Sequence, residues 1–360
     1  MRLAVIQDFL RSGGTENQSL NIAKAWQDLG HSAFLVTFRP GGDLSSRSVD
    51  YGLSQVSLQR RDSRLSFWAP RLERSLVDLD IEGVLLMGRN ANRCGSRLKI
   101  RFPEMPVVAT CRTGRPLTYS YRRSLLAADT VVVNSQWAEE RVLQVGVPRE
   151  NIHCIRNALS LSWETGERAL LRQKMRAELK VPEGTKVLVK VASFIPGKNH
   201  KDLLEAVAGL DEVDPPWVLW LIGRGKTLRP AKQLARQLNI QNRVRFLGFQ
   251  PAIKPYLAAA DLMVSTSLEE SLPNALIEGQ SAGLPVVAYD TAGVKETFLP
   301  DRSGILSPAE DITKFHQGIE QLLADDQLRA EMGKQAETFA QTFPDYLEQG
   351  KAYLRLMKNG

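Results

Sequence analysis

Residues 265–283 read S-T-S-L-E-E-S-L-P-N-A-L-I-E-G-Q-S-A-G, and this stretch says most about the fold and the site. An apolar strand is predicted just before it, at 260–264, and an apolar helix from Ala275 to Ala282. A polar loop joins the two. Glu270 falls in this loop, and Glu278 falls on the first turns of the helix.

The start of this predicted helix is suited to an anion. We expect the backbone N–H groups of residues 271–276 to lack an earlier helical turn, so that they point outward beside the positive end of the helix dipole. Two neighbouring carboxylates can accept hydrogen bonds from hydroxyls. Phosphate held by backbone and hydroxyls held by carboxylates together predict a nucleotide sugar.

Outward from this stretch, strand and helix patterns alternate in two series. The first has predicted strands at 3–6, 33–37, 83–87, 107–110, 130–133 and 152–155, and the second at 186–192, 217–222, 243–247, 262–264 and 285–288. A polar helix predicted at 163–179 connects them. Two such series predict an α/β protein of two doubly wound, Rossmann-like domains facing a cleft, with ligands at the carboxyl ends of the strands. A length of 360 residues also favours two domains.

The positive charge is confined to the first half. Residues 1–160 hold 22 Lys and Arg against 15 Asp and Glu, and residues 89–123 hold nine cations and one acid. Arg89, Arg93, Arg97 and Arg101 are spaced by four, so one helix would align them. This basic segment predicts an anionic substrate or an acidic membrane surface, unless it is only a solvated face. Nucleic acid is not expected, because no aromatic residues interleave the basic ones.

Cysteine and apolar patterns bear on the compartment. The three cysteines show no C-x-x-C spacing, which favours reduced thiols in a cytoplasmic protein. Residues 1–10 are strand-like, so we expect no signal peptide, and no apolar run approaches the about 18 residues of a spanning helix.

Two further motifs carry weaker signals. Gly13 and Gly14 lie between a predicted strand and helix, where they let backbone approach a ligand, although they also fit a simple tight turn. They do not form G-x-G-x-x-G, and Asp43 poorly replaces the ribose-binding acid, so no dinucleotide cofactor is expected. Asp78 and Asp80 have a D-x-D form that we interpret as a solvated helix end, and with only four histidines no metal site is expected.

Taken in order, these pieces resemble the family 4 glycosyltransferases, retaining enzymes of the two-domain GT-B fold. The second half carries V-K-V-A-S at 189–193, P-G-K-N-H at 196–200, S-L-E-E-S-L-P-N at 267–274 with Glu278, A-G-L-P-V-V at 282–287 and G-V-K-E at 293–296. The first half carries G-G-T-E at 13–16, L-G-H at 29–31, N-S at 134–135 and I-R-N at 155–157. The combination is specific because the pieces fall in the expected order on the expected elements.

The resemblance implies a division of the chain. Residues 1–163, with a returning helix at 343–360, would form the acceptor-side domain, and residues 164–342 the nucleotide-sugar-binding domain. Lys198 would meet the donor diphosphate, Glu278 the ribose hydroxyls and Glu270 the transferred sugar, so that Lys198 and Glu270 are the expected catalytic pair. The backbone of Ser271, Leu272, Pro273 and Asn274 would wrap sugar and phosphate. Gly13 and Gly14 would face the diphosphate from the other domain.

Two departures from the family pattern matter. Ser193 stands where the family usually has an arginine that shares the diphosphate, and Arg224 replaces the acid of the usual G-D/E-G turn. We therefore expect Arg224, or Lys226, to supply the missing cation. The family's histidine after the strand at 107–110 is absent, which leaves Arg112 and Arg115, with Arg89, Arg93 and Arg97, as acceptor-side candidates.

The resemblance thus implies a retaining transferase that uses a nucleotide-diphosphate sugar and no metal or other cofactor. An anionic glycan or glycolipid of cell-envelope polysaccharide or lipopolysaccharide synthesis is the expected acceptor. The protein would be cytoplasmic, with peripheral contact to the inner face of an acidic membrane. A nucleotide-sugar 2-epimerase and a non-catalytic GT-B glycan-binding protein remain as alternatives.

Overall fold

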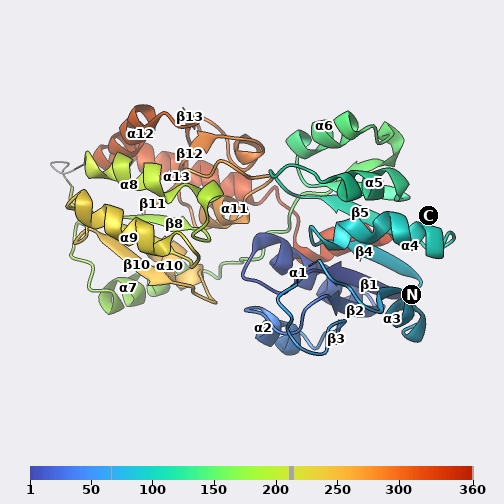
Figure 1. Ribbon diagram of the computed structural model, residues 1–360. Coiled ribbons are helices and arrows are strands. Elements are labelled where there is room, and N and C mark those ends of the chain that lie inside the picture. The colour runs from blue at the N-terminus through green and yellow to red at the C-terminus, as the bar shows by residue number, and fades with distance from the viewer. Residues whose placement is uncertain (66, 211–214, 359–360) are drawn as a thin grey trace. The chain divides into compact units, whose positions relative to one another are not determined.

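A computed structural model describes residues 1–65, 67–210 and 215–358 (Figure 1). The chain divides into two compact units. Unit 1 comprises Met1–Ala158 and Pro344–Gly360, and unit 2 comprises Leu159–Phe343. Each unit is a parallel sheet covered by helices on both faces.

Unit 1 holds a seven-stranded sheet in the order β3-β2-β1-β4-β5-β6-β7, with every pair parallel. The strands are β1 (Arg2–Gln7), β2 (Ser32–Thr37), β3 (Ser54–Ser57), β4 (Gly83–Leu86), β5 (Val107–Cys111), β6 (Thr130–Val133) and β7 (Ile152–Cys154). The helices are α1 (Gly14–Asp28), α2 (Ser45–Asp50), α3 (Leu72–Asp78), α4 (Gly95–Arg101), α5 (Tyr119–Ala127), α6 (Gln136–Val145) and α14 (Tyr346–Lys358), with 3₁₀ turns η1 (Ala91–Cys94) and η2 (Arg149–Asn151).

The two faces of this sheet carry different helices. Helices α3, α4, α5 and α6 pack their apolar side chains on one face, and α1 and α14 pack on the other. Local signals define α6 well: the Ser135 hydroxyl accepts from the Ala138 N–H at 3.2 Å, and Gly146 ends the helix at a φ of 97°.

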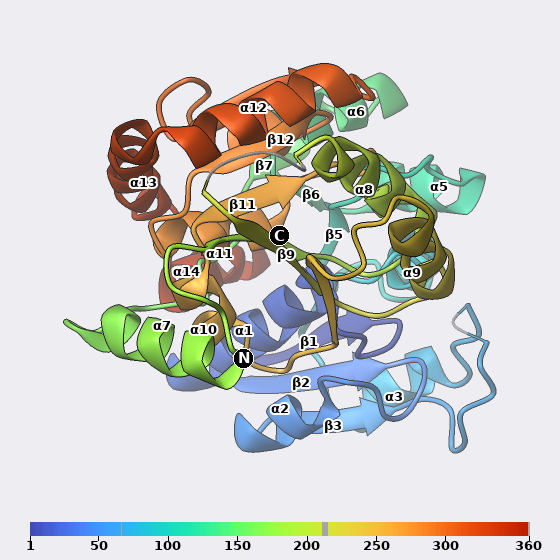
Figure 2. The same cartoon turned by 90° about the vertical axis from the view of Figure 1, so that its left-hand side faces the viewer.

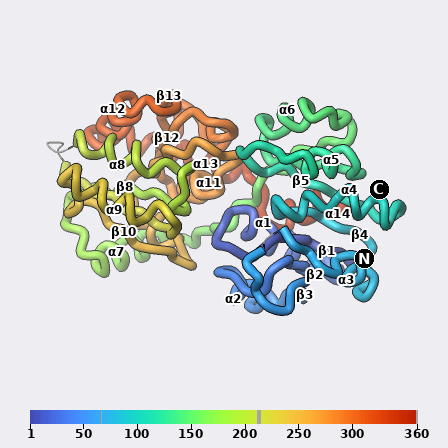
Figure 3. The backbone as a smooth tube through the Cα atoms, in the orientation of Figure 1, coloured from blue at the N-terminus to red at the C-terminus, as the bar shows by residue number. Residues whose placement is uncertain are grey.

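The last helix joins unit 1 although it follows unit 2 in sequence. Figure 3 shows α14, at the red end of the tube, among the blue and cyan elements of unit 1. The Trp26 indole N–H on α1 donates to the Gly350 carbonyl at 3.1 Å, and Tyr353 and Met357 are buried in the core. The expected return of this helix to the first unit is confirmed.

Unit 2 holds a six-stranded sheet in the order β10-β9-β8-β11-β12-β13, again with every pair parallel. The strands are β8 (Lys186–Val191), β9 (Trp217–Ile222), β10 (Val244–Gly248), β11 (Leu262–Ser265), β12 (Val286–Asp290) and β13 (Gly304–Pro308). The helices are α7 (Glu167–Glu178), α8 (His200–Ala208), α9 (Leu228–Gln237), α10 (Lys254–Ala259), α11 (Asn274–Ser281), α12 (Ile312–Ala324) and α13 (Asp326–Ala340), with 3₁₀ turns η3 (Pro196–Lys198) and η4 (Val294–Glu296).

Here α8, α9 and α12 cover one face of the sheet, and α7, α10 and α11 cover the other. The helix predicted at 163–179 begins only at Glu167, and it packs against α10 (Figure 2). The strands are apolar runs such as W-V-L-W-L-I at 217–222, all buried, as expected when helices cover both faces.

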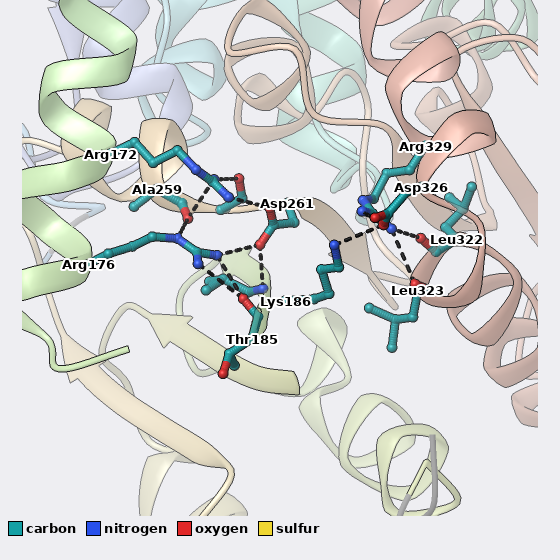
Figure 4. Close-up of polar contacts among 12 residues, drawn as sticks. Arg172, Arg176, Thr185, Lys186, Ala259, Asp261, Leu322, Leu323, Asp326 and Arg329 are labelled. Atoms are coloured by element: carbon teal, nitrogen blue, oxygen red, sulfur yellow. Dashed lines mark hydrogen bonds and ion pairs between the residues drawn. The ribbon is translucent and has the colours of Figure 1, made fainter. Parts of the chain in front are cut away.

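A charged cluster closes the amino end of this sheet (Figure 4). The Asp261 carboxylate accepts from the guanidinium groups of Arg172 and Arg176, at 2.6 Å each, and from the Val187 N–H at 2.7 Å. Nearby, the Lys186 ammonium lies 2.8 Å from Asp326. These pairs tie α7, α13 and the sheet together.

All the strands predicted from sequence are present, and the edge strands β3 and β13 were missed. Among the described residues, no helix combines the length and the apolarity that a membrane-spanning segment needs.

Candidate functional site

The donor residues predicted in unit 2 gather at the carboxyl end of its sheet. The strand order reverses between β8 and β11, and this switch point is where open α/β sheets bind ligands. Ser193 and Lys198 follow β8, Arg224 follows β9, and the stretch from Glu270 to Glu278 follows β11. The fold therefore brings segments distant in sequence to one edge.

The loop after β8 is shaped by its proline and asparagine. Pro196 opens the 3₁₀ turn η3, and Asn199 takes a left-handed φ of 43°, which asparagine tolerates better than most residues. The Leu268 N–H donates to the Gly197 carbonyl at 2.8 Å. The loops after β8 and β11 are thus fastened to each other.

Lys198 and Glu270, the predicted catalytic pair, form an ion pair across these two loops. The Lys198 side chain is 21% exposed and that of Glu270 is 12% exposed, so both are sheltered but reachable from solvent. A half-buried ion pair interacts more strongly than a solvated one, because fewer water molecules screen it.

Helix α11 begins at Asn274, after Pro273, as the loop sequence predicts. One expectation is wrong: the Leu276 N–H does not point outward but donates to the Pro273 carbonyl at 3.2 Å. The reason is the tight first turn that follows the proline. Ser271 is 5% exposed, and Leu272 is buried in an apolar cluster with Ile277 and Phe343. The Leu272 side chain is therefore part of the core, and Glu278 is the half-buried fifth residue of α11.

Ser193 is exposed, and the structure places the backbone of Arg224 beside it. The N–H of Phe194, the residue after Ser193, donates to the Arg224 carbonyl at 2.9 Å. Gly223 and Gly225 flank Arg224 with φ of 146° and 150°, and a Cβ at either would strike the backbone of the loop after β8. Only glycine permits this approach. The Arg224 guanidinium lies 5.3 Å from the centre of the Phe249 ring.

Sequence reasoning missed the buried layer beneath this site. Lys190 and Thr266 are 2% and 0% exposed, and both bind the loop that carries Lys198. His200 is 4% exposed and stacks on Phe194 with ring centres 4.0 Å apart. Burial, with the positive charges of Lys190 and Lys198, lowers the pKa of His200 to about 2. The one available signal was a lysine inside the apolar run V-L-V-K-V.

In unit 1, Gly13 and Gly14 follow β1, next to that sheet's own switch point between β1 and β4. Gly13 is the residue before α1 and has a φ of −88°, so its backbone does not itself require glycine. Gly14 is the first helical residue and is exposed.

The prediction that one helix aligns Arg89, Arg93, Arg97 and Arg101 is wrong. Arg89 precedes the 3₁₀ turn η1, Arg93 lies within it, and only Arg97 and Arg101 share α4. The cause is Asp8, at the end of β1, whose carboxylate accepts from the N–H groups of Asn90 and Ala91 at 3.0 and 2.7 Å. These bonds hold the segment in a tight turn before the helix begins.

The arginines predicted to lie on the acceptor side contact different partners. Arg89 donates to the Pro116 carbonyl at 2.7 Å, Arg93 donates to the Ser120 hydroxyl at 2.8 Å, and Arg97 pairs with Glu73 at 2.5 Å. The Arg112 guanidinium donates to Asn157 at 2.6 Å and to Tyr353 of α14 at 3.2 Å, and the carbonyl of Arg115 accepts from Arg141. Arg112 therefore links β5 to the returning helix.

The D-x-D acids lie at the end of α3, as predicted. Asp78 is paired with Arg74 at 3.6 Å and both side chains are largely exposed, while Asp80 follows with a φ of 48°. In the part of the chain that the structure describes, no three His, Cys, Asp or Glu side chains are grouped so as to hold a metal ion.

Two protein-family models match the chain. The model described as glycosyl transferases group 1 matches residues 172–339, and the model described as glycosyltransferase family 4 matches residues 12–163. Together they span most of both units.

Curated relatives match over part of their length. The lipopolysaccharide core biosynthesis glycosyltransferase LpsE of Rhizobium meliloti (strain 1021) is 33% identical over 219 residues, which are 61% of this chain and 60% of LpsE. The N-acetyl-alpha-D-glucosaminyl L-malate synthase of Bacillus anthracis is 32% identical over 164 residues, 45% of this chain and 42% of that enzyme. The matched regions thus span less than two thirds of these relatives.

Solved structures match over the whole chain. Anabaena HepE in complex with UDP superposes with a TM-score of 0.83 at 20% identity, and both chains are covered completely. Sucrose-phosphate synthase from Thermosynechococcus elongatus superposes with a TM-score of 0.81 at 19% identity, again over both whole chains. At such identities the likeness establishes the fold.

Proposed function

Because the chain belongs to the family 4 glycosyltransferases and has their GT-B fold, we propose that it is a retaining glycosyltransferase. It would move a sugar from a nucleotide-diphosphate sugar to an anionic glycan or glycolipid of cell-envelope polysaccharide or lipopolysaccharide synthesis. The observation that carries the proposal is the Lys198–Glu270 pair at the switch point between β8 and β11.

This pair suits the charges that sugar transfer develops. Breaking the bond to the donor sugar builds positive charge on the sugar and negative charge on the departing diphosphate. An ammonium has three N–H groups, so Lys198 can bind a diphosphate oxygen while it still contacts Glu270. Lys198 would stabilise the leaving group, and Glu270 would offset the charge on the sugar.

Several observations support a nucleotide-sugar donor. Among the structurally similar proteins, HepE has been solved in complex with UDP and with UDP-glucose. In this chain, Glu278 is a residue of α11 and would bind the ribose hydroxyls. The backbone of Arg224 lies beside Ser193, and its guanidinium would supply the cation that the family has at that position. The proposal needs no metal or other cofactor, because Lys198 and Arg224 supply positive charge. Retention requires only that the acceptor attacks from the side of the leaving phosphate.

The acceptor would meet the basic surface of unit 1. The name of LpsE places that relative in lipopolysaccharide core biosynthesis. Arg89, Arg93, Arg97, Arg112 and Arg115 remain the proposed acceptor-side residues.

A surface formed by α4 and α5 fits peripheral contact with an acidic membrane. A cavity of about 460 Å³ lies there, lined by Ser96, Lys99, Ile100, Arg123, Leu126 and Ala127. Ile100 and Leu126 are 76% and 52% exposed, and exposed cations such as Arg101 and Arg123 lie on the same helices. Apolar side chains ringed by cations match the boundary between acyl chains and anionic headgroups.

A thermal-shift screen of UDP-, GDP- and ADP-sugars tests the donor first, followed by a transfer assay with lipopolysaccharide core and polyprenyl-diphosphate glycans. The expected result is stabilisation by one donor class and sugar transfer with retention. Conversion of the donor to its 2-epimer without acceptor would instead identify an epimerase. Failure to bind any nucleotide sugar would favour a non-catalytic protein.

Vesicle flotation tests the membrane contact. Wild type should float with vesicles that contain anionic lipid and not with neutral ones, and Arg101→Gln/Arg123→Gln should lose this binding. Arg74→Gln/Arg149→Gln removes the same charge from exposed positions on α3 and η2 and should still bind. Equal loss of vesicle binding in both double variants would show that binding depends only on the net charge of the protein.

A further inference from the structure

Lys190 lies beneath the candidate site, and the proposed function gives it no role. It is the fifth residue of β8 and is 2% exposed. Its ammonium donates to the Lys198 carbonyl at 2.6 Å and to the Thr266 hydroxyl at 2.7 Å. The Thr266 hydroxyl in turn donates to the Asn199 carbonyl at 2.6 Å. Lys190 therefore joins the loop after β8 to the loop after β11.

A buried amine is a costly way to fill this position. Both acceptors of Lys190 are uncharged oxygens, and the burial of an ammonium without a carboxylate partner carries a large desolvation penalty. A methionine would occupy a similar volume in the apolar strand V-L-V-K-V without that penalty. The amine is thus explained by the bonds that it makes to the two loops.

We propose that Lys190 is a positioning residue of the donor site, which sets the placement of Lys198 and Glu270 by fastening the two loops that carry them. The inference rests on the proposed function, in which Lys198 meets the donor diphosphate. The backbone of Lys198 is bound from below by Lys190, while its side chain pairs with Glu270. Because Lys190 is buried, it acts through Lys198 and does not touch the donor.

The charges around Lys190 predict that donor binding is linked to a proton. Lys198 and His200 face it from the loop after β8 and the start of α8, Asp202 from α8, and Glu270 from the loop after β11. Burial, with the charge of Lys198, lowers the pKa of Lys190 to about 7. The diphosphate of a bound donor adds negative charge and favours the protonated amine. Donor affinity should therefore rise as the pH falls from about 8 to 6, by at most about tenfold per pH unit.

The matched control lies on the same strand. Lys186 opens β8, and its ammonium pairs with Asp326 at the opposite end of the sheet. Lys186→Met makes the same chemical change as Lys190→Met, in the same strand, away from the candidate site. Thr266→Val is a second variant, which keeps the amine and removes the hydroxyl that binds Lys190 and the Asn199 carbonyl.

The experiment uses the full chain and the nucleotide sugar found by the thermal-shift screen. Titration calorimetry at pH 6, 7 and 8, in two buffers of different ionisation enthalpy, gives donor affinity and proton uptake, and steady-state assays give kcat and KM. We expect Lys190→Met to lower kcat/KM by about 10–100-fold, as for a misplaced catalytic group, and to abolish the pH dependence and the proton uptake. Thr266→Val should lower kcat/KM less and keep the pH dependence, and Lys186→Met should match wild type.

The outcomes separate this inference from the proposed function. Wild-type protein that binds no nucleotide sugar overturns the proposed function, and the role of Lys190 falls with it. Wild-type protein that binds the donor while Lys190→Met keeps the same kcat, KM and pH dependence overturns this inference alone. If Lys190→Met does not fold, Thr266→Val decides: unchanged kcat and KM in that variant overturn the inference.

Discussion

Strand β8 carries one lysine at each end, and the two lysines differ in their burial and in their partners. At the amino end, Lys186 is 17% exposed and pairs with the Asp326 carboxylate, beside the Asp261 cluster. At the carboxyl end, Lys190 is buried and binds only a carbonyl and a hydroxyl, beneath the Lys198–Glu270 pair. Charge at the amino end is neutralised by the protein itself and serves stability. Charge at the carboxyl end lies around the proposed donor site.

Among the variants that test this difference between the two ends, Lys198→Met should have the largest effect. Lys198→Met should lower kcat by about 10²–10³-fold, because it removes the cation that would stabilise the leaving diphosphate. Lys186→Met should leave kcat within about twofold. Steady-state transfer assays measure both, with thermal unfolding to check that both variants fold. A comparable loss of kcat in the two variants would contradict the division between the ends of the sheet.

At the amino end, the sensitive residue is Asp261. Asp261→Asn should lower the free energy of unfolding by about 3 kcal/mol, because it leaves two sheltered guanidinium groups without their carboxylate. Urea unfolding measures the change. Asp78→Asn is the control, since Asp78 is 64% exposed and its pair with Arg74 is solvated. Donor affinity should be the same in wild type and Asp261→Asn, and a weakened affinity would show that the two ends are coupled.

The two ends should also differ in their response to acid. The pKa of His200 is lowered from 6.5 to about 2, so the unfolded chain takes up this proton first as the pH falls. Stability is therefore lost below about pH 6.5, by at most about 1.4 kcal/mol per pH unit. The pKa of Asp326 is lowered from 3.8 to about 2 by its bonds to Lys186 and Arg329, so its contribution is lost only below pH 3.8.

Unfolding free energies between pH 6.5 and 4.5 test this difference. His200→Leu should lose less stability than wild type as the pH falls. The variant has no imidazole at this position, so the unfolded chain no longer gains a proton there that the folded chain does not bind. Asp326→Asn should keep the wild-type slope in this window, although its stability at neutral pH is lower. If the unfolding free energies of wild type and His200→Leu fall with pH at the same slope, His200 is not the cause of the loss of stability in this range.

The smallest expected effect belongs to a lysine close in sequence to the site. Lys201 is 69% exposed and pairs with Glu205 one helical turn away, at 3.4 Å. Lys201→Met should change the unfolding free energy by less than about 0.5 kcal/mol and leave donor affinity unaltered. A comparison of Lys201→Met with Lys198→Met shows whether two lysines only three positions apart differ in their effect on donor binding.

The central strands were predictable because each is an apolar run long enough to be buried on both faces. Of the four edge strands, β7 and β10 were predicted, whereas β3 and β13 were missed. β3 reads S-Q-V-S and is only partly buried, and β13 is a short run that begins with glycine and ends with proline. A strand at a sheet edge buries less side chain, so its sequence carries less of the apolar signal on which the prediction depends.

The placement of charged residues was harder to predict than their presence. The four-residue spacing of Arg89, Arg93, Arg97 and Arg101 predicted one helix. However, Asn90 donates a hydrogen bond to Asp8, 82 residues away in sequence, and this bond turns the segment before the helix begins. Periodicity reports only local preference, and a non-local hydrogen bond overrode it here.

By itself, the sequence determined two parallel α/β units, the loops that carry Lys198 and Glu270, and the helix that starts after Pro273. These follow from local apolar patterns and from proline, glycine and asparagine at the turns. Only the tertiary structure decided which charges meet. Lys198 and Glu270 are 72 residues apart, and Lys190 and Thr266 are 76 apart. They touch because the strand order places β8 beside β11, and that order depends on long-range packing that no local pattern records.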